Sequence, residues 1–333
     1  MMRKYLFLLG LPLLSGCFED DPSLAREPIF FSVGQADLGS TSEADYLDQV
    51  FYDVEGNRVS ATVNREHWDL ALGCRAEQPN LFVNSAVLMS VAFTGDLQWN
   101  GPYRVEDYQF QFERAANYLQ RGLMPGSLRG SEPQGEVFLI DLGRDRNNRK
   151  RGHRVLQWQG YSDGTYSLRL SNLDGSNAID LDIPINSDYA NVYLSFAEPQ
   201  DTLLLEPRKE EWDILFTRYM ERLFDGSDTL DYSVTGALLQ PNTWETAAWT
   251  DSIKSFDDLT LDDLQQQSFR PGLDRLGHDW KDFDLDANGF TVLPHRYFAL
   301  RKGPLGPWYK WQFTDFYNAQ GKKGVIGFRY LGL

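Results

Sequence analysis

The chain has 333 residues, a formal net charge of −16, 42% hydrophobic residues and 14% aromatic residues. This length predicts about two domain-sized units, and the apolar share supports a packed core rather than disorder. The acidic balance disfavours binding to nucleic acid or docking on anionic lipid, because both of these surfaces are negatively charged.

The N-terminus carries a secretory pattern. A basic start and a short apolar run lead into residues 14–17 (LSGC), which resemble a bacterial lipobox. The apolar run is shorter than the roughly 20 residues that a membrane-spanning helix needs. We therefore expect a lipoprotein signal peptide over 1–17, acylation of Cys17 and an acidic tether over 18–28. A plain signal peptide and a buried N-terminal strand are the alternatives.

Period-two alternation dominates the remainder of the chain. Trp68, Leu70, Leu72 and Cys74 recur at every second position, which predicts a strand with one apolar face. Cys74 is therefore interpreted as a small buried core residue rather than a reactive thiol. With Cys17 assigned to the lipobox, the 2 cysteines form no disulfide framework.

A helical period occurs in two segments. The first spans 105–124, where Tyr108 and Phe112 share one face. The second spans 260–267, with Thr260 as the expected N-cap and acidic residues in the first turn.

The chain also contains an internal repeat. Residues 66–72 (EHWDLAL) are echoed by 210–216 (EEWDILF), so that Trp68 and Trp212 lie 144 positions apart (212 − 68). Upstream, 50–52 (VFY) and 192–194 (VYL) lie 142 positions apart (192 − 50). In each Trp-Asp pair the Trp is expected to fill a sandwich core, and the Asp to point outward or bind turn amides. These echoes predict two related β modules, 29–180 and 181–333, although chance similarity among aromatic-rich strands is an alternative.

The C-terminal run 309–330 (YKWQFTDFYNAQGKKGVIGFRY) strongly resembles the end of the HmuY-like lipoprotein family. Residues 211–219 (EWDILFTRY), 234–239 (VTGALL) and 277–281 (GHDWK) resemble other blocks of that family, in family order. The resemblance implies an all-β fold, here two related antiparallel β-sandwich-like modules with one or two short helices. It also implies a surface or periplasmic lipoprotein that takes up haem and passes it to a TonB-dependent outer-membrane receptor, without chemistry on the ligand.

Haem iron requires axial donors, usually His or Met. The resemblance places one axial histidine of the family at Leu285, and it finds no His in the 244–269 segment, so the axial pair of the family is not retained. The remaining candidates are His278 and His295 in loop-like segments, and the thioether of Met220, for which core packing is the alternative. His67 and His153 are interpreted as surface residues.

Other chemistry is less well supported. Residues 284–289 (DLDANG) match the start of a calcium-binding loop, but His295 stands where the bidentate Glu is expected, so an Asx-rich turn is favoured. Zinc-protease spacing, a nucleophile elbow and a phosphate loop are absent from the sequence. A glycosidase carboxylate pair stays open, and no enzyme is predicted. Five tryptophans could wall a planar ligand or fill the core: Trp244, Trp249, Trp280, Trp308 and Trp311.

The sequence therefore predicts an outer-membrane, lipid-anchored protein, on the cell surface or the periplasmic face, that binds haem or a similar planar ligand. The alternative is a non-enzymatic interaction lipoprotein that keeps the fold without haem.

Overall fold

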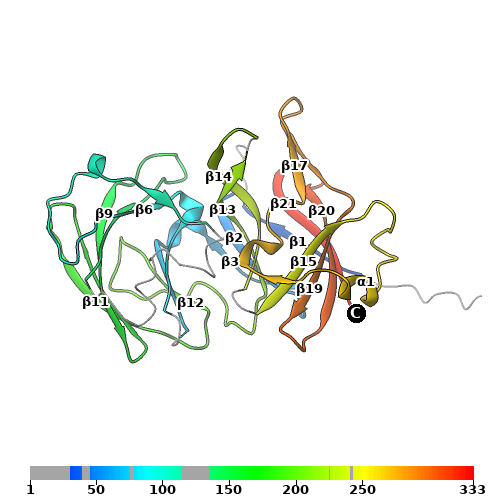
Figure 1. The fold of residues 1–333 in the computed structure, drawn as a ribbon, viewed down its shortest axis with the longest axis horizontal. Coiled ribbons are helices and arrows are strands. Elements are labelled where there is room, and N and C mark those ends of the chain that lie inside the picture. The colour runs from blue at the N-terminus through cyan, green and yellow to red at the C-terminus, as the bar shows by residue number, and fades with distance from the viewer. Residues whose placement is uncertain (1–30, 40–45, 76–78, 115–134, 225, 241–242) are drawn as a thin grey trace, which may run out of the picture. The chain divides into compact units, whose positions relative to one another are not determined.

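The computed structural model describes residues 31–39, 46–75, 79–114, 135–224, 226–240 and 243–333 (Figure 1). Antiparallel strands dominate these ranges, which confirms the predicted all-β class. The helix expected at 260–267 is confirmed as α1 (Leu261–Gln265), where the Asp263 carboxylate accepts a hydrogen bond from the Thr260 amide at 2.9 Å. Within the described ranges, no helix combines the length and the apolar character that crossing a membrane requires.

One group of strands builds what we call the second module. Its large sheet has the order β1-β21-β20-β19-β15-β16, and its smaller sheet the order β14-β13-β2-β3. Trp311, Phe313 and Phe328 fill the core, with the Trp311 and Phe328 rings stacked at 4.4 Å. The strands are β1 (Ser32–Asp37), β2 (Asp48–Asp53), β3 (Arg58–Asn64), β13 (Ile214–Phe224), β14 (Thr229–Leu239), β15 (Trp244–Thr250), β16 (Arg270–Pro271), β19 (Arg296–Lys302), β20 (Trp308–Tyr317) and β21 (Lys323–Gly332), with the hairpin β17 (Lys281–Asp284) and β18 (Gly289–Val292).

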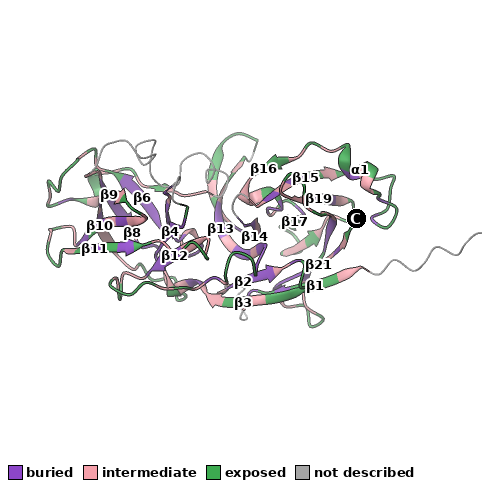
Figure 2. Cartoon of the chain, turned by 90° about the horizontal axis from the view of Figure 1, so that it is seen from below, coloured by how far each residue is buried: buried purple, intermediate pink, exposed green. Residues whose placement is uncertain are grey.

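The remaining strands build the first module around a separate core. Its sheets have the orders β11-β10-β9-β8-β6-β7 and β12-β4-β5. Buried residues run through these strands (purple in Figure 2), and consecutive residues of β4, β5 and β8 are buried, so these strands are covered on both faces. The strands are β4 (Leu70–Gly73), β5 (Leu81–Val83), β6 (Ser90–Phe93), β7 (Gln111–Phe112), β8 (Val137–Asp141), β9 (His153–Ser162), β10 (Thr165–Ser171), β11 (Ile179–Pro184) and β12 (Asn191–Leu194).

The two modules have the same topology. Each strand of the sheet β11-β10-β9-β8-β6-β7 has a counterpart, in the same order, in β1-β21-β20-β19-β15-β16. The register repeats as well, because Phe51 pairs with Ala61 as Tyr193 pairs with Leu203, and both members are shifted by 142 positions. The repeat read from the sequence is therefore a repeat of structure.

The first strands of each repeat, however, pair with the other repeat. On β2, Tyr52 pairs with Ile214 of β13, whereas on β12 Leu194 pairs with Leu70 of β4. The strand β1 likewise adds to β21 at the far end of the chain. Residues 32–64 thus complete the module built from 214–332, although the expected split near residue 180 assigned them to the other module. As a boundary between domains that split stays a prediction.

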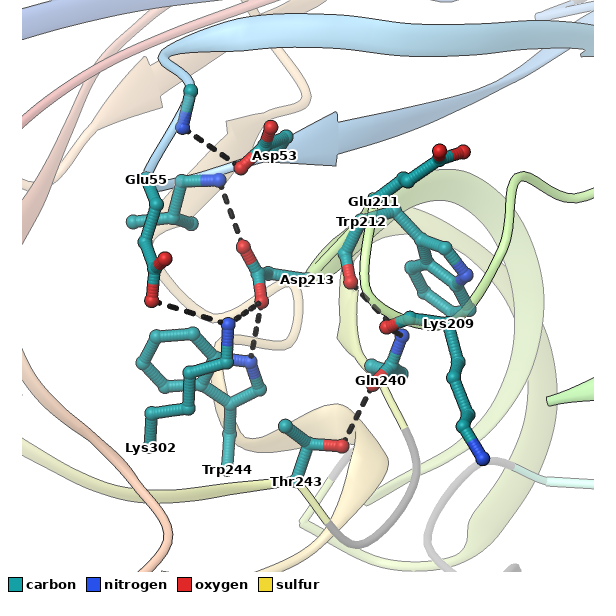
Figure 3. Close-up of polar contacts among 12 residues, drawn as sticks. Asp53, Glu55, Lys209, Glu211, Trp212, Asp213, Gln240, Thr243, Trp244 and Lys302 are labelled. Carbon is teal, nitrogen blue, oxygen red and sulfur yellow. Dashed lines mark hydrogen bonds and ion pairs between the residues drawn. The ribbon is translucent and has the colours of Figure 1, made fainter. Parts of the chain in front are cut away.

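The two Trp-Asp pairs hold these exchanged strands. Asp213 is 3% exposed and its Oδ2 accepts the amide of Val54 at 2.9 Å, directly after β2. Figure 3 shows Lys302 and Trp244 directed at the same carboxylate, at 3.1 Å and 3.3 Å from Oδ1. This carboxylate therefore binds a turn amide, which is one of the two predicted alternatives, and it is buried rather than directed outward.

Asp69 makes the equivalent contacts in the first module. It is fully buried, and its Oδ2 accepts the amide of Phe196 at 2.7 Å, two residues after the end of β12. Its Oδ1 accepts from Arg151 at 2.6 Å. Val54 and Phe196 are again 142 positions apart, so both repeats use one device to hold a strand from the other repeat.

The helix predicted at 105–124 is wrong where the structure describes it. Only a 3-10 turn (Val105–Asp107) forms, followed by β7. Tyr108 and Phe110 lie two positions apart and pack against the core beside β6, so tertiary pairing selects the period of two over the helical period. Residues 115–124 lie outside the described ranges.

Strand exchange predicts that the two repeats stay bound after the chain is cut between them. A protease site inserted in the exposed turn at 174–177, between β10 and β11, would separate β1–β10 from β11–β21. We expect the cut chain to elute from a sizing column as one species of unchanged size, because both modules contain strands of both fragments.

The control is the same cut sample in denaturant, where two fragments must elute. Separation of the fragments under native conditions would contradict the exchange.

Candidate functional site

Two sequence blocks that are distant in the chain meet at the loop that carries His278. The amide of Ala237 on β14 donates to the carbonyl of Gly277, and the amide of Gly277 donates to the carbonyl of Ala237, both at 3.0 Å. A side chain at Gly236 would lie 2.2 Å from the Gly277 carbonyl oxygen, so only glycine permits this approach. Trp280 Nε1 donates to the same carbonyl at 3.1 Å. The backbone of His278 is thereby fixed on β14.

The imidazole of His278 is half-buried beside β13. Its Nδ1 lies 3.5 Å from the hydroxyl of Tyr219. Burial, with a smaller contribution from the Lys281 charge, lowers the pKa of His278 below its usual value. The ring is therefore neutral near neutral pH, which is the state in which imidazole ligates a metal.

His278 lies in the wall of a cleft of about 420 Å³, which we call the aromatic cleft. Clefts that bind small ligands measure roughly 300–1,000 Å³. Its lining includes four aromatic rings, two cationic side chains and the carboxylate of Asp282. The rings are Tyr46, Tyr232, Phe283 and Phe290, and the cations are Arg218 and Lys281.

Neither cation of the aromatic cleft is within ion-pair distance of a described carboxylate, although Asp282 also lines the cleft. Within the described ranges neither Arg218 nor Lys281 forms an ion pair, and burial lowers the pKa of both. Lys281 Nζ donates to the carbonyl of Thr235 at 2.6 Å and lies 4.2 Å from the Trp280 ring centre. Burial brings the pKa of Lys281 to about 7. The cleft can therefore supply positive charge to an anionic group.

A second cleft of about 450 Å³, the polar cleft, shares His278 with the aromatic cleft. Arg270, Arg275 and Arg296 contribute to its lining. Arg296 forms an ion pair with Asp279, so part of this charge is neutralised. His278 thus separates an aromatic space from a polar one.

The other two ligand candidates lie elsewhere. His295 is exposed before β19, with its Nδ1 3.4 Å from the Tyr297 hydroxyl. Met220 is 3% exposed and follows Tyr219 on β13, and successive strand side chains point to opposite faces. Neither residue lines the aromatic or the polar cleft. Cys17 lies outside the described residues.

Sequence reasoning missed Arg218, Tyr219 and Lys281, although all three stand in the blocks that resemble the HmuY-like family. Their signal was a cation or a hydroxyl among otherwise apolar strand residues. No periodicity shows that β13 and the 277–281 loop face each other.

Other sequence predictions can be placed directly. Cys74 is buried, and burial raises its pKa to about 11, which confirms an inert core thiol. Asp284 Oδ1 accepts the amides of Asp286 at 2.8 Å and Ala287 at 3.0 Å, so 284–289 forms the favoured Asx-type turn of the β17–β18 hairpin. No group of three or more metal-ligating His, Cys, Asp or Glu residues occurs in the described ranges.

The remaining histidines and the tryptophan cluster also have clear positions. His67 is exposed as predicted, and His153 is half-buried with its Nε2 3.6 Å from Asp141. Leu285 is 84% exposed at the hairpin turn. Of the five tryptophans, three are buried in the core and two are half-buried. The buried three are Trp244, Trp280 and Trp311.

No protein-family model and no curated protein matches the chain. Among solved structures, apo PinO from Porphyromonas gingivitis is 10% identical, with a TM-score of 0.30, and covers 92% of this chain and 98% of its own. An HmuY-like heme binding protein from Bacteroides vulgatus is 16% identical, with a TM-score of 0.19, over 42% of this chain and 82% of its own. The apo HmuY analogue of Tannerella forsythia is 13% identical, with a TM-score of 0.23, over 49% of this chain and 88% of its own.

Replacing Gly236 by Ala should loosen the His278 loop. The new methyl group would lie 2.2 Å from the Gly277 carbonyl oxygen, so one of the two segments must move. We expect the free energy of unfolding to fall by about 1–3 kcal/mol, measured by urea titration.

Gly73→Ala on β4 is the matched control. There the nearest atom would lie at 3.5 Å, an ordinary contact, and we expect a loss of less than about 1 kcal/mol. Equal losses in both variants would contradict the close approach at Gly236.

Lys281 should make stability depend on pH. The folded chain binds its proton only below a pKa of about 7, whereas the unfolded chain binds it below 10.5. Between these values the unfolded chain holds more protons, so this residue makes stability rise with pH, by at most about 1.4 kcal/mol per pH unit. Lys281→Met should remove that rise. Urea titrations of both proteins at pH 7 and pH 9 test this. An equal change in the free energy of unfolding between the two pH values in both proteins would contradict it.

Proposed function

We propose that this chain is a non-enzymatic binding protein that holds haem, or a planar anionic ligand of the same kind, in the aromatic cleft. The observation that carries the proposal is the pairing of aromatic walls with two cations that form no ion pair with a described carboxylate, beside a neutral imidazole. A porphyrin offers matching features, namely an apolar plane, carboxylates at one edge and an iron that takes an axial nitrogen.

Each lining residue has a distinct role in this proposal. Phe283 and Phe290, whose ring centres are 4.9 Å apart, present apolar surface to the ligand plane. Arg218 and Lys281 compensate the ligand carboxylates, which also repays part of the cost of burying these cations. His278 is the axial donor, and its fixation on β14 limits the rotational freedom lost on binding.

The cellular setting is proposed from the sequence alone. Acylation of Cys17 and the acidic tether over 18–28 would attach the protein to the outer membrane, at the cell surface or the periplasmic face. A TonB-dependent receptor is the expected partner for ligand transfer. The proposed role is delivery, because the cleft holds a ligand without an arrangement for changing it.

Titration of haemin into the chain from residue 18 onward tests the proposal. We expect a sharp, saturable Soret band at micromolar haemin. His278→Ala should shift this band and weaken affinity by at least about tenfold, or 1.4 kcal/mol. His295→Ala is the matched control, since His295 is exposed and lines neither cleft, and its spectrum should match the unmodified protein.

Two outcomes would overturn the proposal. The first is the absence of any saturable spectral change, which favours the alternative of an interaction lipoprotein without haem. The second is an equal spectral effect of both histidine substitutions, which would place the ligand away from the aromatic cleft.

A further inference from the structure

A third cavity lies among strands that both repeats contribute. It measures about 130 Å³, and we call it the junction cavity. Its lining is mostly apolar and comes from equivalent positions of the two repeats. These pairs are Trp68 and Trp212, Ala71 and Leu215, Gln49 and Asn191, Phe82 and Leu238, and Val83 and Leu239.

In the first repeat the polar groups of this lining are satisfied. Trp68 Nε1 donates to Gln49 Oε1 at 2.8 Å. Gln49 Nε2 in turn donates to the hydroxyl of Thr217 at 2.9 Å. Both ends of the Gln49 amide therefore have a hydrogen-bond partner, and so does the indole N–H of Trp68.

In the second repeat the equivalent residues, Trp212 and Asn191, form no hydrogen bond with each other. Trp212 is 3% exposed, yet its Nε1 has no hydrogen-bond partner among the described residues, and Asn191 Oδ1 is likewise buried without a partner in that part of the chain. Asn191 is one methylene shorter than Gln49, and its Nδ2 donates instead to Glu206 Oε2 at 3.1 Å. A buried polar group without a partner costs about 1–3 kcal/mol. A group that accepts from Trp212 Nε1 and donates to Asn191 Oδ1 would satisfy both of these buried atoms.

We propose that the junction cavity binds a small neutral molecule with an apolar body and one hydroxyl group, of the phenol class. The hydroxyl oxygen accepts from Trp212 Nε1 and its hydrogen is donated to Asn191 Oδ1, which fills the place of the missing methylene and amide. The apolar body lies against the aliphatic and aromatic walls. The junction cavity shares Arg218 with the aromatic cleft but is not lined by His278, and this inference does not depend on the function proposed for that cleft.

Size and hydrogen bonding restrict the ligand class. An apolar cavity of about 150 Å³ is known to accept benzene, so a single ring fits this volume whereas a porphyrin does not. Glu206 adds a buried carboxyl group that already accepts from the Asn191 amide at 2.7 Å and the Tyr193 hydroxyl at 2.8 Å. Arg114 and Arg218 also line the cavity, so charge alone does not select the ligand. The ligand group must accept from Trp212 Nε1 and also donate to Asn191 Oδ1, which a hydroxyl does and its deprotonated anion does not, so a neutral molecule is favoured.

Phenol and toluene are the probes, because they share a ring and differ in the hydroxyl. Binding to the chain from residue 18 onward is measured by isothermal titration and by ligand-detected NMR. We expect phenol to bind at least about tenfold more tightly than toluene, a difference of 1.4 kcal/mol that one satisfied hydrogen bond can supply. Trp212→Phe keeps the ring and removes the donor, so the two affinities should become equal.

Asn191→Gln supplies the missing methylene and should let the longer amide accept a hydrogen bond from Trp212 Nε1, as Gln49 accepts one from Trp68. We expect phenol binding to fall at least about tenfold while the melting temperature rises. Gln49→Asn is the matched control, because it opens the first repeat, lowers stability and leaves the Trp212 donor available for phenol. His278→Ala should leave phenol binding unchanged, which separates this site from the haem proposal.

Several results would overturn the inference. These are equal affinities of the unmodified protein for phenol and toluene, no saturable binding of phenol, or a crystal structure grown with phenol that shows only water between Trp212 and Asn191. If Asn191→Gln fails to fold, the comparison of phenol with toluene on the unmodified protein still decides.

Discussion

Two buried carboxylates determine how this chain is assembled. Asp213 holds the amide after β2, and Asp69 holds the amide after β12. A buried carboxylate is costly unless it is paired and hydrogen-bonded, and each one here has both an amide and a cation, Lys302 or Arg151. Each carboxylate thereby fixes a strand from the other repeat, so neither module is complete without both parts of the chain.

The His278 site depends on this assembly through a continuous set of strand pairs. The loop of His278 is bound to β14, β14 pairs along its length with β13, and β13 is extended by the exchanged strand β2. A change at the Asp213 junction would therefore reach the aromatic cleft through the sheet that carries one of its walls.

Duplication also shows where the two modules have diverged. The hairpin β13–β14 has 11 residues in each strand, whereas its counterparts β4 and β5 have 4 and 3. The added length carries Arg218, Tyr232 and Val234, which line the aromatic cleft. One module has thus gained a ligand-sized cleft by lengthening a single hairpin, while the same sheet order was retained in both.

The sequence predicted local features well because their causes are local. Alternating apolar residues marked the strands, the Trp-Asp echo marked the repeat, and the Thr260 cap marked α1. The segment after Val105 failed because Tyr108 and Phe112 satisfy both a helical period and a strand period, and only pairing with β6 decides between them. Spacings of 142 and 144 identify equivalent strands but contain no information on which repeat each strand pairs with.

The candidate site could be predicted only in part for the same reason. His278 and Lys281 are close in sequence, so one block suggested this loop, whereas Arg218 reaches the cleft from a strand some 60 positions earlier (278 − 218). The gap between Trp212 and Asn191 cannot be seen in a sequence at all. It becomes visible only when the hydrogen bonds of the two repeats are compared.

Charge supports the proposal that the aromatic cleft binds an anionic ligand. The chain carries a net charge of −16, and a field of that sign repels anionic ligands from most of a surface. Arg218 and Lys281 form an exception, because they are cations in a partly apolar cleft and form no ion pair in the described part of the chain. An anion next to Lys281 would raise its lowered pKa toward the usual value, so near pH 7 binding would draw a proton onto this amine. The cost of burying Lys281 in the free protein thus becomes a source of selectivity for a ligand that brings negative charge.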